Sequence, residues 1–282
     1  MNLVPLIFFV FGTIIGSFLN VVVLRYGSLR LSSARSLCFS CGKMLHWYEL
    51  IPVFSFFVQR GRCRGCKSAI SLQYPLVELL TGLVFVAVLS KHSFLLSSSY
   101  SVIQLLVIGS ELLLWSLLIS LSVYDIKHKI IPNALVYTAA LVSLLILFLT
   151  FNFSLSTFNS PDLWSGPLFA APFALLWFFS KGRAIGFGDA KLIVFFPWFL
   201  GLAKGLSALI IGFWIGAGVS LGLLFLKAST SSLPKHLCPT FRAKLRHLSM
   251  KTELPLGPFL VLGLFLVYVF GWDVTSLSLL LQ

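Results

Sequence analysis

The stretch LVPLIFFVFGTIIGSFLNVVVL, residues Leu3 to Leu24, decides the fold class because its 22 residues carry no charged side chain. A helix needs about 20 consecutive apolar residues to cross the hydrocarbon core of a bilayer. A secretory signal peptide starts with a basic segment and has a shorter apolar run, whereas the first basic residue here is Arg25. We therefore interpret residues 1–24 as a first transmembrane span that is retained.

The composition of the whole chain indicates the same class. Of the 282 residues, 58% are hydrophobic and only 10% are charged, and the mean hydropathy is +0.99. In soluble domains about a quarter of the residues are charged, so this chain suits a lipid bilayer better than water. The net charge of +13 is typical of membrane proteins whose cytoplasmic loops are rich in Lys and Arg. We predict no nucleic-acid partner.

Apolar runs recur along the chain and predict an all-α polytopic membrane protein with about eight transmembrane helices. If the chain crosses eight times, all but two of its 21 Lys and Arg residues lie on one side, the exceptions being Lys91 and Lys204. Positively charged loops remain in the cytoplasm, so we expect the N-terminus on the opposite face. The predicted spans are residues 3–24, 72–90, 102–124, 130–150, 163–180, 189–203, 205–226 and 256–271.

Between the first and second predicted spans lies a basic loop, residues 25–71, which holds four of the five cysteines. The loop is long enough to fold as a small cytoplasmic module, and residues 72–282 then form the main membrane domain. Its cysteines occur as two Cys-x-x-Cys pairs, whose two-residue spacer lets both sulfurs of a turn point at one metal ion. The pairs are Cys38 with Cys41 and Cys63 with Cys66.

The two Cys-x-x-Cys pairs predict a zinc site with four thiolate ligands. Four protein ligands leave no open coordination position, which is typical of a structural zinc. Gly42 and Gly65 lie beside the pairs and suit tight turns. The alternatives are two disulfides or free thiols, and disulfides rarely persist in a reducing cytoplasm.

Two acidic residues are expected at one depth of the membrane, where ionisable groups usually mark function. Asp125 ends the third predicted span, and Asp189 begins the sixth, which places both at the cytoplasmic face. Carboxylates that lie close together share a proton, so that one acts as a general base on water while the other acts as an acid. Two alternatives remain open: Asp125 pairs with Lys127 or Lys129, and Asp189 caps a helix.

Four further residues are predicted to support such a site. Gly186 and Gly188 flank Asp189 in the chain and let backbone approach a bound substrate closely. Lys191 either acts on a carboxylate or extends to the membrane interface. Glu78, just inside the second predicted span, is either a site carboxylate or an acid favoured by the helix dipole in a first turn.

Short stretches along nearly the whole chain carry the motifs of one known family, in that family's order. They are Gly16–Val21 with Arg25, Ser36–Cys41, Ile51–Ser55, Gly61–Cys66, Ile70–Glu78, Asp125 with Ile131–Asn133, Gly186–Lys191 and Leu254–Phe259. On these motifs the chain resembles the bacterial type IV prepilin peptidases, also called prepilin leader peptidase/N-methyltransferases. It departs from the family pattern at Leu256, where an aromatic residue is more usual.

The resemblance implies a bifunctional enzyme of the bacterial inner membrane, with a periplasmic N-terminus and an active site that faces the cytoplasm. Such an enzyme cuts the leader from type IV prepilins or pseudopilins after a Gly, and Asp125 and Asp189 match its catalytic aspartates. It also N-methylates the new N-terminal residue with S-adenosylmethionine, and a zinc carries over to the four cysteines. The sequence predicts neither the individual substrates nor the oligomeric state.

Two other classes of function remain open at this point. A transporter with a zinc module would line its path with buried acids such as Glu78 and Glu111, although the chain has no evident internal repeat of the kind that transporters often show. A non-enzymatic assembly scaffold would keep its function with Asn in place of both Asp125 and Asp189.

Overall fold

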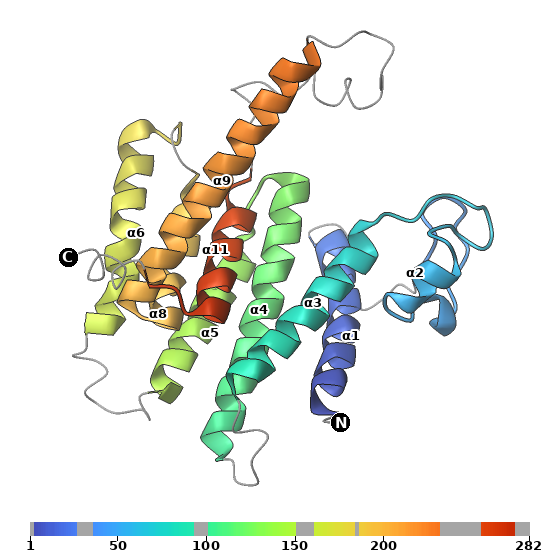
Figure 1. Ribbon diagram of the computed structural model, residues 1–282, viewed down its shortest axis with the longest axis horizontal. Helices are drawn as coiled ribbons and strands as arrows, with labels where there is room; N and C mark the ends of the chain where they lie inside the picture. The colour runs from blue at the N-terminus through green and yellow to red at the C-terminus, as the bar shows by residue number, and fades with distance from the viewer. Residues whose placement is uncertain are drawn as a thin grey trace. The chain divides into compact units, whose positions relative to one another are not determined.

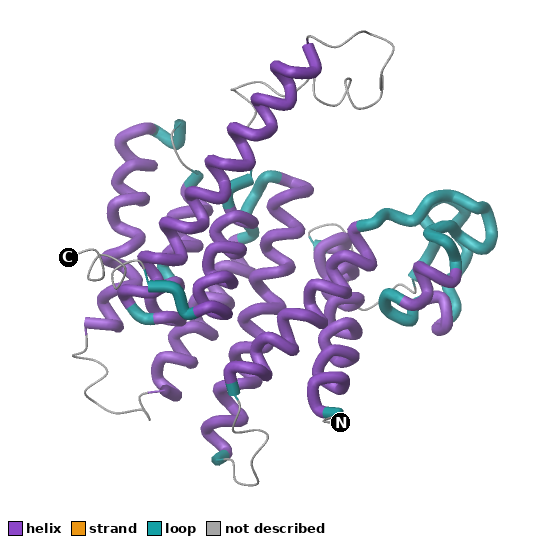
Figure 2. The backbone as a smooth tube through the Cα atoms, viewed as in Figure 1, coloured by secondary structure: helices purple, strands orange, loops and turns teal. Residues whose placement is uncertain are grey.

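The computed structural model describes residues 3–26, 36–92, 101–150, 161–183, 186–231 and 255–273, and over these ranges the chain is helical without a β-strand (Figure 1 and Figure 2). The predicted all-α class is confirmed. The chain divides into an N-terminal unit, Met1–Val123 with Tyr137–Phe153, and a C-terminal unit, Tyr124–Val136 with Ser154–Gln282. Residues 27–35 of the predicted module and Leu254 of the last motif lie outside the described residues.

Six helices in the described part of the chain are long and apolar enough to cross a bilayer, so this is a multi-pass membrane protein. An α-helix rises about 1.5 Å per residue, and about 20 residues therefore match a hydrocarbon core of about 30 Å. Six of the predicted spans are confirmed as helices of this length, and the eighth, residues 256–271, is confirmed as a shorter helix. The six are α1 (Val4–Arg25), α3 (Gln73–Lys91), α4 (Val102–His128), α5 (Asn133–Thr150), α6 (Pro161–Ser180) and α9 (Leu202–Ser231).

The sixth predicted span, residues 189–203, is helical but interrupted, as its Gly and Pro residues indicated. The structure has two short helices there, α7 (Phe187–Ile193) and α8 (Phe195–Leu200). Pro197 explains the break, because it has no N–H for the carbonyl four residues earlier and its ring crowds that carbonyl. Neither helix can cross a bilayer alone, and the 14-residue α11 (Gly257–Phe270) is also short. The count of eight spans stays a prediction.

In the N-terminal unit, glycines let α1 and α3 pack side by side at close range (Figure 1). A Cβ atom added to Gly16 would lie 2.7 Å from the Cα of Glu78, and one added to Gly12 would lie 2.8 Å from the Cα of Gly82. Small residues four positions apart are typical of contacts between membrane helices, where close backbones improve van der Waals packing. The contact buries Glu78 against α1.

In the C-terminal unit, larger neighbours hold the short helix α7 in place. α7 packs on α6 and α8, and α8 packs on α6 and α9. The ring centroids of Phe187 in α7 and Trp177 in α6 lie 4.5 Å apart. In α8, the indole N–H of Trp198 donates to the carbonyl of Leu163 at 2.8 Å. Side-chain packing therefore fixes a helix that is too short to be stable alone.

The last helix, α11, is fixed by a second close contact between glycines. A Cβ atom added to Gly212 of α9 would lie 2.9 Å from the Cα of Leu260, and one added to Gly263 would collide with the carbonyl of Ala208. This contact holds the start of α11, at Gly257, in a fixed position relative to α9.

Candidate active site and metal centre

Asp125 lies in the last turn of α4 and is only 4% exposed. Its Oδ2 accepts a hydrogen bond of 3.2 Å from the backbone N–H of Gly257, at the start of α11. The N-terminal end of a helix stabilises negative charge, so α11 supports Asp125 as a carboxylate. The described contacts of Asp125 give no support to the predicted alternative of an ion pair with Lys127 or Lys129.

Asp189 is half-buried in the first turn of α7. The N-cap residue of α7 is Gly186, with extended backbone angles of φ −70° and ψ 141°, so Asp189 is not itself the N-cap. Its carboxylate accepts the backbone N–H of Gly186, so the alternative of a capping role is supported in this form. A Cβ atom at Gly186 would lie 3.3 Å from Oδ2 of Asp189. Glycine at this position therefore leaves space beside the carboxylate.

The structure brings the two predicted carboxylates into one site. They are close enough for the charge on Asp125 to act on Asp189. The side chain of Ile131 lies between the elements that carry them: a Cβ atom on Gly188 would be 2.9 Å from its Cβ, and one on Gly257 would be 3.7 Å from its Cδ1. The catalytic roles of the two aspartates stay predictions.

Lys191 connects α7 to the start of α5 by a hydrogen bond. Its Nζ donates to Oδ1 of Asn133 at 2.9 Å and lies 4.4 Å from the ring centroid of Phe187. Since Asn133 closes the motif that begins at Ile131, the contact joins the two aspartate motifs. The supporting role of Lys191 stays a prediction.

Sequence reasoning missed Gly257, which is the residue that binds Asp125 most directly. A Cβ atom at this position would lie 2.7 Å from Oδ2 of Asp125, too close for any side chain without movement. Gly257 belongs to the stretch Leu254–Phe259, which was noted only for its resemblance to the family's last motif. Periodicity and charge carry no signal for a glycine that contacts a carboxylate 132 residues away.

The four predicted metal ligands form a cluster in the N-terminal unit. One sulfur from each of Cys38, Cys41, Cys63 and Cys66 lies within 4.8 Å of all the others, and the thiols are free. The sulfurs of Cys38 and Cys66 are 3.9 Å apart. A tetrahedral site with Zn–S bonds of about 2.3 Å requires roughly 3.8 Å between sulfurs, so the cluster fits zinc.

The N–H groups of Cys41 and Ser40 donate to Cys38 and lower the pKa of its thiol to about 6.

The two Cys-x-x-Cys turns have the same backbone geometry. In the first, Cys38 N–H donates to the carbonyl of Lys43 and Gly42 N–H donates back to the carbonyl of Cys38, both at 2.9 Å. In the second, the corresponding bonds join Cys63 to Ser68 at 2.9 Å and Lys67 to Cys63 at 3.0 Å. The two turns therefore hold their cysteines in the same backbone arrangement.

The position that needs a left-handed backbone is Gly42 in the first turn and Lys67 in the second, with φ of 68° and 60°. Gly65 lies within the second turn, as predicted, but it does not take the left-handed backbone. Gly65 instead leaves room at the cluster, because a Cβ atom there would lie 3.3 Å from Cδ of Lys43 and 3.7 Å from the sulfur of Cys41.

Replacing Gly42 with Ala is expected to weaken metal retention by the module. A left-handed backbone costs a residue with a Cβ atom about 1–2 kcal/mol, which corresponds to roughly a tenfold lower chelator concentration for release of the metal. The matched control is Gly65→Ala, whose Cβ would meet mainly the flexible side chain of Lys43. Titration with a chelator, followed by metal analysis, checks this; an equal effect of both variants would contradict it.

Glu78 contacts the cysteine module. It is 7% exposed, and its Oε2 accepts a hydrogen bond of 2.6 Å from the backbone N–H of Val53. Val53 has φ 60° and ψ −53°, and Phe54 N–H donates across it to the carbonyl of Pro52, which defines a strained γ-turn. Glu78 lies in the N-terminal unit, whereas both aspartates lie in the C-terminal unit. Its predicted support of the aspartates stays a prediction.

The Glu78→Ala variant is expected to loosen this turn, because the N–H of Val53 loses its acceptor. An unsatisfied buried donor costs about 1–3 kcal/mol, so the amide of Val53 should exchange with solvent about tenfold faster or more. Glu78→Gln is the matched control, since its side-chain oxygen still accepts the bond. Hydrogen exchange with residue resolution checks this, and unchanged exchange in Glu78→Ala would contradict it.

Glu49 is a second residue that sequence reasoning missed. It ends the 3-10 helix η1 (Trp47–Glu49) and is 6% exposed. Its carboxylate accepts the N–H of His46 at 3.0 Å and pairs with Lys43 at 3.2 Å. These contacts lower the pKa of Glu49, the bond from His46 most strongly. Glu49 thus joins the first Cys-x-x-Cys turn to the rest of the module, before α2 (Phe54–Val58).

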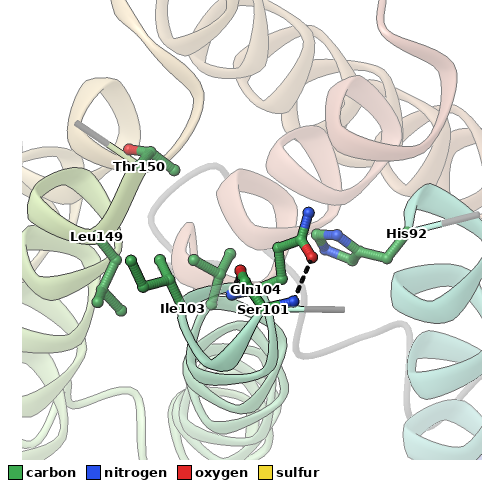
Figure 3. Close-up of a pocket in the computed structure, with 7 residues that line it drawn as sticks. His92, Ser101, Ile103, Gln104, Leu149 and Thr150 are labelled. Carbon is green, nitrogen blue, oxygen red and sulfur yellow. Dashed lines mark hydrogen bonds between the residues drawn. The ribbon is translucent and has the colours of Figure 1, made fainter. Parts of the chain in front are cut away.

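Cavity size does not identify the site. A cavity of about 340 Å³ lies in the N-terminal unit where α3 and α5 end and α4 begins, and Figure 3 shows His92, Gln104 and Thr150 around it. His92 pairs there with Glu111 at 2.9 Å. A smaller cavity of about 240 Å³ lies in the C-terminal unit and reaches Leu256, the residue before Gly257.

These features define a class: a multi-pass helical membrane protein with two carboxylates in one site and a four-thiolate cluster. Comparison with family models identifies residues 10–92 as a bacterial peptidase A24 N-terminal domain and residues 112–221 as a member of the type IV leader peptidase family. The first match contains all four cysteines and the second contains both aspartates. Together the matches cover more than half of the chain. The protein belongs to the type IV leader peptidase family.

Individual relatives agree with this assignment. A prepilin leader peptidase/N-methyltransferase of Myxococcus xanthus is 34% identical over 232 residues, which cover 80% of this chain and 64% of the relative. Relatives of the same name from Bacillus subtilis and Pseudomonas putida are 29% and 27% identical and cover 96% and 94% of this chain, and 96% and 90% of their own length. No solved structure matches.

Proposed function

We propose that this protein is a membrane aspartic endopeptidase that removes the leader from type IV prepilins or pseudopilins and then N-methylates the new N-terminus. The observation that carries the proposal is the meeting of Asp125 and Asp189 in one site, within the region that matches the type IV leader peptidase family. The relatives' names, prepilin leader peptidase/N-methyltransferase, support both activities. S-adenosylmethionine is the proposed methyl donor, and its binding residues are not assigned.

The two aspartates divide the acid and base roles. In this proposal Asp125 is the general base on a water molecule, because the N–H of Gly257 at the start of α11 favours its charged form and opposes the effect of burial, which favours the protonated form. Asp189 holds the shared proton and donates it toward the scissile carbonyl as the water attacks. When the C–N bond breaks, a proton passes to the leaving amine. Gly186 leaves room for the substrate backbone beside Asp189. The same role predicted for Gly188 is not supported, because the side chain of Ile131 fills the space next to it.

The cysteine cluster has a structural role in this proposal. Cys38, Cys41, Cys63 and Cys66 would hold one zinc ion, which supplies a closed site that joins the two turns and takes no part in peptide cleavage. The protein would lie in the bacterial inner membrane with its N-terminus in the periplasm. Its active site would face the cytoplasm, where the basic loops predict that Asp125 and Asp189 lie.

The test uses the purified protein in detergent, loaded with zinc and mixed with a prepilin whose leader ends in Gly. Mass spectrometry in the presence of S-adenosylmethionine is expected to show loss of the leader and the gain of one methyl group. Absence of cleavage with a folded, zinc-loaded protein and several prepilins would overturn the proposal in favour of a transporter or a scaffold. Cleavage without methylation would contradict only the proposed N-methyltransferase activity.

A further inference from the structure

The cavity of about 240 Å³ in the C-terminal unit forms a groove between α9 and the start of α11. Four of its lining residues recur on one face of α9 at helical spacing, and two come from the beginning of α11. The groove is lined by Phe213, Gly216, Ala217, Ser220, Leu256 and Phe259. Its volume is below the range of about 300–1,000 Å³ that small-molecule and cofactor sites occupy, so the groove suits a single side chain better than a cofactor.

The wall of the groove is apolar. Ser220 is its one hydroxyl-bearing residue, and that hydroxyl donates to the carbonyl of Gly216 in its own helix at 2.7 Å. Phe213 and Phe259 line the space from two helices, and the ring of Phe213 also stacks on that of Phe173, with centroids 5.9 Å apart. Aromatic rings bind another aromatic side chain by stacking or edge contacts. A charged side chain would lose its hydration there without a partner.

Gly216 keeps the groove open. A Cβ atom added at this position would lie 3.4 Å from Cδ2 of Phe259, an ordinary van der Waals contact, so any longer side chain would extend into the space that the groove now provides. Gly218, two residues along the same helix, has nothing within 4 Å of such a Cβ atom. The two glycines therefore form a matched pair, one inside the groove and one outside it.

The groove is continuous with the aspartate site. Leu256 lines the groove, and the next residue, Gly257, donates its N–H to Asp125. One peptide unit therefore separates the groove wall from the carboxylate that we assign as the base. A peptide bond held for attack beside Asp125 would have the side chain of a neighbouring residue within reach of the groove.

We propose that this groove binds the apolar side chain of the first substrate residue after the scissile bond, the residue that cleavage leaves at the new N-terminus. This inference rests on the proposed peptidase function and adds a specificity site to it. The groove accepts a large apolar or aromatic side chain and excludes a charged one, so it also fixes the register of the peptide relative to Asp125 and Asp189.

The experiment compares two prepilins that differ only at the first residue after the cut, one with Phe and one with Ala. Gly216→Leu fills the groove and is expected to lower kcat/KM for the Phe substrate by tenfold to a hundredfold, roughly the range for apolar pocket contacts. The same variant should cleave the Ala substrate at close to the wild-type rate. Gly218→Leu is the control and should leave both rates unchanged. Ala217→Leu, which narrows the same groove from an exposed position, is the second test variant.

The outcomes separate this inference from the proposed function. If the wild-type protein cleaves neither prepilin, the peptidase proposal fails and the groove proposal fails with it. If the wild-type protein cleaves both and the groove variants slow the two substrates equally, the groove holds a lipid chain or serves packing only, and the inference is overturned. The inference is also overturned if Gly216→Leu and Ala217→Leu, with unchanged thermal unfolding, leave the rate on the Phe substrate intact.

Discussion

Replacing either Asp125 or Asp189 with Asn is expected to lower the rate of leader cleavage about a thousandfold. Asn has nearly the same shape as Asp but neither accepts a proton from water nor donates one to a leaving amine, and such acid–base steps contribute about 10²–10⁴ to rate. Because the two carboxylates act as one unit, the double variant should be little worse than either single variant. Single-turnover cleavage followed by mass spectrometry measures the effect.

The control for these variants is Asp273→Asn. Asp273 follows the far end of α11, and the 14 residues of that helix place its two ends about 20 Å apart, so the control changes an acid outside the site. Thermal unfolding and zinc content should match the wild-type values in all three variants. Cleavage at more than a tenth of the wild-type rate by either Asp125→Asn or Asp189→Asn, in folded protein, would remove that aspartate from the mechanism.

Gly257→Ala is the second large effect that we expect. The added Cβ would lie 2.7 Å from Oδ2 of Asp125, so either the carboxylate or the start of α11 has to move by several tenths of an ångström. A displacement of about 1 Å in a catalytic group can cost about 10² in rate, and we expect a loss of that order in kcat. The close contact between α9 and α11 at Gly212 and Gly263 limits how far the helix can retreat.

Gly218→Ala is the matched control for Gly257→Ala, because a Cβ atom at Gly218 meets nothing within 4 Å. It should retain the wild-type rate. A near-normal rate in Gly257→Ala would mean that the hydrogen bond to Asp125 has no part in catalysis. If Gly257→Ala does not fold, its thermal unfolding transition is lost. The rate of leader cleavage is then measured for Gly257→Ser in its place.

The long helices could be predicted because membrane insertion leaves a simple signal, a run of about 20 apolar residues. Apolar content alone could not distinguish a continuous span from the pair α7 and α8. The deciding residue is Pro197, whose effect depends on the carbonyl four residues earlier and not on hydropathy. Topology predicted that Asp125 and Asp189 lie at one face of the membrane, because the ends of their helices were expected there, but it could not predict that the two carboxylates meet.

Details of the sites that depend on contacts distant in sequence could not be predicted. The spacing of the Cys-x-x-Cys pairs predicted the cluster, but nothing in the sequence indicated that Lys67 adopts the left-handed backbone of the second turn. Gly257 and Glu49 act through backbone N–H groups and a buried pair. Such contacts require that two separate segments fold before the partner of either residue is defined.

The break between α7 and α8 has a consequence for biogenesis. The insertion machinery releases a segment into lipid when that segment is apolar and long enough to span, and helices of seven and six residues do not qualify on their own. Their insertion therefore depends on the neighbouring helices α6 and α9, on which they pack. The bond from Gly257 to Asp125 needs α11 as well, which follows α9 in the chain. In a nascent chain, the proposed aspartate site therefore stays incomplete until α11 has been translated.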